Sequence, residues 1–114
     1  MKEPQTLDFD YNGKSYSIGF NRKVCKQMER QRFNPANVTN APVSTIIEFF
    51  RWSFVMNHRQ KVDLSMAEEI YNHMTEKDLL IDTLIDMYNA CVNTLFEEPD
   101  DNDEKKITWK KVTD

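Results

Sequence analysis

The chain has 114 residues, of which 39% are hydrophobic and 30% are charged, and its formal net charge is -4. This length fits one domain with a single core, and the presence of only two glycines disfavours an all-β sandwich with many tight turns. Because the chain is acidic, the chain as a whole gains no counterion-release energy from nucleic-acid binding. It contains no run of about 18 apolar residues, so no membrane span is predicted.

A β-hairpin is predicted over residues 6–20. The Asn-Gly pair at 12–13 is preferred in a two-residue type I′ turn, where both residues take positive φ. Apolar and polar residues alternate on both sides of the turn, which sets Phe9 opposite Tyr16 on one apolar face. A lone hairpin is marginal in water, so this face must pack on helices or the sheet must gain a strand.

A first helix is predicted at about 22–32, after the N-cap residue Asn21. One side of it is apolar, through Val24, Cys25 and Met28. The segment 33–42 contains two prolines and several asparagines, and it is predicted to be a loop.

The second helix, about 43–58, is apolar over an unusually wide arc of roughly 220° of its wheel. One interpretation is a fully buried central helix. The other is an exposed partner-binding patch, because a small chain with two very short helices has little with which to cover so many aromatic side chains. The second interpretation assigns partner binding to Ile46, Ile47, Phe49, Phe50, Trp52, Phe54 and Met56.

A polar connection is predicted at 58–64, and two further helices complete the predicted domain, 1–96. A short helix at about 66–74 is expected to start with a capping box formed by Ser65 and Glu68. A long helix at about 76–96 is expected to start with a weaker capping box formed by Thr75 and Asp78. The predicted fold is therefore mainly α with an N-terminal β-hairpin (α+β), with about four helices.

Residues 97–114 are predicted to form a C-terminal tail that is first acidic and then basic. The acidic part, 97–104, cannot bury apolar surface and repels itself, so it is expected to be disordered or extended. The basic part carries Ile107 and Trp109 in strand-like alternation. It is either mobile or pairs with a strand edge of a neighbouring copy.

No local signature of catalysis or cofactor binding is present. The cysteines and histidines lack the short spacings typical of zinc sites, and two glycines cannot form a phosphate-binding loop. No nucleophile motif occurs either. We therefore expect a non-enzymatic protein without cofactor or metal, in which Cys25 and Cys91 are free, buried thiols.

The first helix carries a basic cluster that allows a second hypothesis. With aromatic residues nearby on the hairpin, such a cluster is typical of single-strand nucleic-acid binders, and it also fits a solvated helix face that balances acidic residues elsewhere. The cluster consists of Arg22, Lys23, Lys26, Arg30 and Arg32. A small nucleic-acid-binding regulator is therefore an alternative function.

Several short motifs together resemble a known family. They are Phe9–Ile18, Phe20–Val24 and Lys26–Glu29 in the first half, then Glu69–Tyr71, the stretch from Leu80 to Asn89, and the acidic segment leading to Trp109. This pattern is similar to tail assembly chaperones of long-tailed, non-contractile phages of Gram-positive bacteria.

The resemblance implies a late viral protein of the host cytoplasm that binds and solubilises the hydrophobic, helical tape measure protein. Such chaperones are absent from the mature virion. We expect self-association into homo-oligomers, because many copies would line one client. Nucleic acid and membranes are not expected partners. A minor structural component of a virion is a third possibility.

Overall fold

The computed structural model describes residues 6–58 and 61–112 and confirms the α+β fold class: a hairpin followed by four α-helices. Residues 1–5, 59–60 and 113–114, which belong to the predicted domain, its polar connection and the predicted tail, lie outside the described residues. The elements are β1 (Thr6–Tyr11), β2 (Lys14–Gly19), α1 (Arg22–Arg30), the 3₁₀ helix η1 (Pro35–Thr39), α2 (Pro42–His58), α3 (Leu64–His73), α4 (Lys77–Asn93) and the 3₁₀ helix η2 (Thr94–Phe96).

The hairpin has the predicted turn and register. Asn12 has φ 52° and Gly13 has φ 77°, as a type I′ turn requires. Phe9 lies opposite Tyr16 in an antiparallel pair, and their rings stack at 5.5 Å between centroids. The local sequence was sufficient here because turn and alternation specify the same register.

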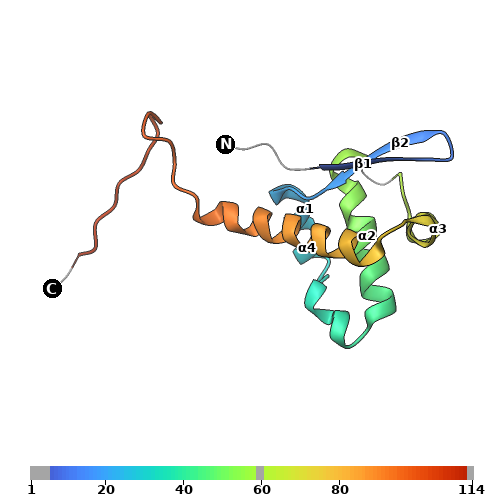
Figure 1. Ribbon diagram of the computed structural model, residues 1–114. Helices are drawn as coiled ribbons and strands as arrows, with labels where there is room; N and C mark the ends of the chain where they lie inside the picture. The colour runs from blue at the N-terminus through green and yellow to red at the C-terminus, as the bar shows by residue number, and fades with distance from the viewer. Residues whose placement is uncertain (1–5, 59–60, 113–114) are drawn as a thin grey trace.

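The end of α2 fastens β2 to the helical body. The Ser17 N–H donates to His58 Nε2 at 3.0 Å, and the Ser17 carbonyl accepts from Asn57 Nδ2 at 3.3 Å. The ring of His58 also contacts that of Tyr16, with centroids 5.2 Å apart. The hairpin therefore lies across the C-terminal end of α2 (Figure 1).

The predicted cap of the first helix is confirmed, and the two later ones are wrong. Asn21 accepts the N–H of Val24 at 2.8 Å. For α3, the carboxylate of Asp63 accepts the N–H of Met66 at 2.8 Å, so the helix starts before Ser65. For α4, Glu76 occupies the cap position with φ 51° and no side-chain hydrogen bond caps the helix.

The core surrounds α2, which contacts β2, η1, α1, α3 and α4. Figure 1 shows α2 in the centre, with α4 crossing it at mid-length and α3 beside its C-terminal half. The predicted loop 33–42 folds into η1 and covers the N-terminal half of α2. Val62 lies in the predicted polar connection, yet it is only 2% exposed and joins the core.

The segment 97–112 contains no helix or strand, and every residue in it is exposed. Backbone hydrogen bonds close two turns between Asp100 and Lys106. Beyond them the chain is extended and runs away from the helical body (Figure 1). Within the described ranges, no helix is both long and apolar enough to cross a membrane.

Candidate partner-binding surface

The predicted aromatic patch on α2 is not exposed. Phe50 and Phe54 are 0% exposed, and Phe49 and Trp52 are also buried. The expectation of an exposed patch is therefore wrong for these residues, and the alternative of a central buried helix describes this part of α2. The strand β2, the 3₁₀ helix η1 and the other three α-helices all contact α2, so the small chain has enough elements to cover it.

Aromatic neighbours from β2, α3, α4 and the connection between β2 and α1 cover these side chains. Phe49 stacks on Phe20 with ring centroids 5.0 Å apart, and it meets Tyr88 of α4 edge to face at 6.0 Å. Phe50 meets Tyr71 of α3 at 5.4 Å, and Phe54 meets Tyr16 of β2 at 5.6 Å. Such edge-to-face pairs add specific geometry to the burial of apolar area. These aromatic residues therefore hold the domain together and are not available to a partner.

The other predicted residues, Ile46, Ile47 and Met56, are half-buried. Ile46 and Ile47 lie three and four residues after Val43, whose side chain is 74% exposed. Residues at this spacing share one helix face. We call Val43, Ile46 and Ile47 the α2 strip. It is the open end of the face that continues into buried Phe50, and its first residue was missing from the predicted site.

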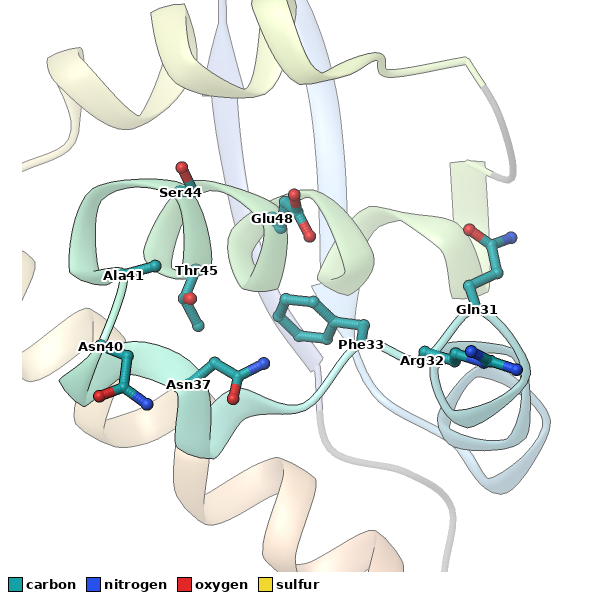
Figure 2. A pocket seen from close by; sticks show the side chains of 9 residues that line it. All are labelled: Gln31, Arg32, Phe33, Asn37, Asn40, Ala41, Ser44, Thr45 and Glu48. Atoms are coloured by element: carbon teal, nitrogen blue, oxygen red, sulfur yellow. The ribbon is translucent and has the colours of Figure 1, made fainter.

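A groove follows another face of α2. Its main hollow has a volume of about 420 Å³ and lies between the end of α1, η1 and the first turns of α2 (Figure 2). A second hollow of about 180 Å³ shares Gln31, Phe33 and Glu48 with it. Apart from Phe33 and Ala41, the main hollow is lined by polar or charged side chains. The groove therefore does not match an apolar client as well as the α2 strip does.

Other exposed apolar side chains lie on and after α4. Leu79 and Ile85 are exposed on α4, and Leu95 and Phe96 are exposed at its end. In the extended segment, Ile107, Trp109 and Val112 are more than four-fifths exposed. These apolar side chains are therefore accessible to another molecule.

The basic cluster of the first helix is exposed as a solvated face. Arg22 donates to Thr94 Oγ1 at 2.8 Å and so links α1 to the end of α4. The aromatic residues that follow the hairpin turn, Tyr16 and Phe20, are buried. They are therefore not available for stacking on bases, which weakens the nucleic-acid hypothesis.

The two cysteines are free and buried, as predicted. Burial, together with the neighbouring thiol of Cys91, raises the pKa of Cys25 to about 12. A thiol with so high a pKa is a poor nucleophile at neutral pH. Among residues 6–58 and 61–112, no three His, Cys, Asp or Glu side chains are grouped to hold a metal ion.

Comparison with known proteins gives a family but no activity. The model of a family described as "Domain of unknown function (DUF5055)" matches residues 2–112, almost the whole chain. No curated protein and no solved structure matches.

Proposed function

We propose that this chain, which belongs to the family described as a domain of unknown function (DUF5055), is a tail assembly chaperone of a long non-contractile-tailed phage. In this role it binds the hydrophobic tape measure protein in the host cytoplasm, catalyses no reaction, and leaves before the virion is complete. Motifs in the hairpin, α1 and α4 resemble those of tail assembly chaperones, and this resemblance suggests the function. The α2 strip supplies a surface with the matching chemistry.

The α2 strip is the observation that carries the proposal. Val43, Ile46 and Ile47 present aliphatic side chains on one face of a helix, next to the buried aromatic core. An apolar helix can pack its ridges against such a face in the way that helices pack within a domain. The tape measure protein is expected to be a long apolar helix, so one chaperone copy would cover one short part of it.

The size of the strip fits weak and reversible binding. Full burial of one aliphatic side chain is worth roughly 1.5–3 kcal/mol, and two of the three are already half-buried. The gross gain is therefore on the order of 4 kcal/mol, which the costs of association largely cancel for a single copy. Several linked copies on one client bind far more tightly than one copy alone. A chaperone that must be displaced by tail tube subunits needs this combination.

The acidic segment supports the same role. Glu97, Glu98 and the carboxylates up to Glu104 belong to exposed residues that follow the exposed Phe96. Charge of one sign on a surface opposes aggregation of a complex that carries a hydrophobic client.

Co-expression with tape measure fragments tests the proposal. The wild-type chain is expected to keep apolar tape measure segments in the soluble fraction and to co-purify with them. A variant with Val43→Asp and Ile47→Asp is expected to stay folded, because both side chains reach solvent, and to lose the client. Leu79→Asp with Ile85→Asp is the matched control, since it places the same two charges on exposed apolar positions of α4.

The possible outcomes distinguish a wrong binding surface from a wrong function. If the double variant is folded and retains the client, the α2 strip is not the binding surface. If the wild-type chain solubilises no tape measure segment, the chaperone proposal itself fails. Detection of the chain by mass spectrometry in purified mature virions would favour a minor structural component instead.

A nucleic-acid-binding regulator remains the second candidate, because the basic face of α1 is exposed. Its test is a titration with single-stranded DNA and RNA at two salt concentrations. Binding through Arg22, Lys23 and Lys26 would weaken steeply with salt. We expect no such salt-dependent binding, because the net charge of -4 gives the chain as a whole no counterion-release energy.

A further inference from the structure

We propose that the outer edge of β1 accepts residues 106–110 of a second copy of this chain as a third β-strand. This interaction between copies does not depend on the chaperone proposal. It follows from the pairing of the hairpin, the extended C-terminal segment, and the match of side chains between the two.

The pairing shows which backbone groups of β1 point outward. In an antiparallel ladder, alternate residues turn their N–H and C=O groups away from the partner strand. Ser17 is such a residue on β2, because its N–H and C=O bond to α2 and not to β1. Its partner Asp8 must therefore face outward on β1, as do Thr6 and Asp10, two residues to either side.

The two edges of the sheet differ. Asn57 and His58 occupy the outward backbone groups of Ser17, and β2 packs along α2. On β1, no hydrogen bond among residues 6–58 and 61–112 uses the backbone of Asp8 or Asp10 on the outer side. An open edge of this kind is a template for an added strand.

The C-terminal segment has the properties of a missing strand. Residues 107–112 are extended, and their backbone makes no hydrogen bond within the described part of the chain. Ile107 and Trp109 fall on one side of an extended chain, and Lys106, Thr108 and Lys110 on the other. Trp109 is 84% exposed, which is unusual for the largest apolar side chain in a protein.

The two sides of the segment match the two faces of β1. Leu7, Phe9 and Tyr11 are only half-buried on the inner face, so Ile107 and Trp109 can pack beside them. On the outer face, β1 carries Asp8 and Asp10, whose carboxylates accept hydrogen bonds from Ser17 and Ser15. Lys106 and Lys110 would lie next to these carboxylates. Both the apolar pattern and the charges are therefore complementary.

A second copy is the occupant that the arrangement favours. In the structure the segment projects away from its own hairpin (Figure 1). The side chains of Ile107, Trp109 and Val112 are more than four-fifths exposed. The edge and the strand belong to the same sequence, so copies can join reciprocally or head to tail.

Sedimentation equilibrium over a range of concentrations tests the proposal. The wild-type chain is expected to show at least twice its monomer mass of 13.6 kDa at high concentration. Two variants are expected to fall to the monomer mass: an edge variant with Asp8→Lys and Asp10→Lys, and a strand variant with Ile107→Asp and Trp109→Asp. The matched control is Asp82→Lys with Asp86→Lys, which reverses two exposed charges on α4.

Mixing the two monomeric variants gives the decisive measurement. The edge variant has an intact strand and the strand variant has an intact edge, so an equimolar mixture is expected to form a heterodimer. Circular dichroism spectra that match the wild type show that each variant is folded. A reversal of charge in the strand, Lys106→Glu with Lys110→Glu, is expected to restore self-association to the edge variant.

Three results would overturn the proposal. A wild-type chain that stays monomeric at every concentration excludes pairing between copies, whether or not its own segment folds back on β1. Folded edge and strand variants that associate like the wild type place the interface elsewhere. A mixture that remains monomeric excludes exchange of the strand.

Discussion

At the scale of single residues, two left-handed positions have opposite expected responses to substitution. Arg32 has φ 59° and closes α1, because Phe33 N–H bonds to Met28 O at 2.9 Å and Arg32 N–H to Glu29 O at 2.9 Å. This is the Schellman arrangement, in which glycine is preferred at the position of Arg32. Gly13, at φ 77°, is already glycine, and a Cβ there would meet nothing within 4 Å.

We expect Arg32→Gly to raise the free energy of unfolding by about 0.5–1 kcal/mol, because the left-handed backbone then carries no Cβ penalty. Gly13→Ala is expected to lower it by about 1 kcal/mol through the backbone alone, since no contact is disturbed. Urea denaturation of both variants measures these changes. Equal changes of one sign would show that backbone conformation is not the cause.

The Cys25 thiol predicts an alkaline limit of stability. Its pKa is raised by burial from 9.0 to about 12, so the unfolded chain loses this proton at lower pH than the folded chain does. A raised pKa contributes stability below pH 9.0 that is lost progressively as the pH rises towards 12. The free energy of unfolding is therefore expected to fall more steeply above pH 9.0 in the wild type than in Cys25→Ala.

Denaturant unfolding at several pH values compares the two proteins. Tyr71, whose pKa is also raised by burial, titrates in both and cancels in the difference. Parallel pH profiles would show that the Cys25 thiol does not differ between the folded and unfolded states.

At the scale of elements, α2 separates what the sequence predicts from what it does not. The existence and length of the helix follow from local pattern, and so do the hairpin and its register around residues 12–13. The exposure of α2 does not. A wide apolar arc says only that much surface needs covering. Besides the other helices, β2 covers α2 although it is distant in sequence, and η1 covers it from a segment predicted as a loop.

The helix caps also divide into those that the local sequence predicts and those that depend on tertiary packing. The carboxamide of Asn21 was a sufficient signal because nothing nearby competes with it. For α3, Asp63 and Ser65 are both residue types that can cap a helix. Asp63, which follows the buried Val62, takes the cap position. Of the predicted partner-binding residues, Ile46 and Ile47 stay accessible because only the C-terminal half of their helix face is covered by α3. That boundary is a tertiary property.

The burial along α2 gives a prediction for this helix. Phe54→Ala is expected to lower the free energy of unfolding by about 3–5 kcal/mol, because its ring is fully buried and leaves a cavity. Val43→Ala, on the exposed strip, is expected to change it by less than about 0.5 kcal/mol. Thermal or denaturant unfolding checks both, and equal losses would show that Val43 is as buried as Phe54.

At the scale of the whole molecule, the domain and its C-terminal segment are expected to be separable. Residues 97–112 are all exposed, so a chain truncated after Glu98 is expected to keep the midpoint of thermal unfolding of its monomer. Its mass in solution is expected to fall to that of the monomer, because the proposed third strand is gone. A truncated chain with an unchanged oligomer mass would show that residues 99–114 do not join the copies.

The attachment of Asn57 and His58 to Ser17 has a consequence for sheet growth. Fibrils of the cross-β type lengthen because each new strand offers a fresh edge while the opposite edge stays open to the same addition. Here one side of the sheet ends in an amide and an imidazole that belong to a helix, and no incoming strand can copy that arrangement. A chain with the exposed side chains of Trp109 and Ile107 thus has one flank of its sheet protected against amyloid-like stacking.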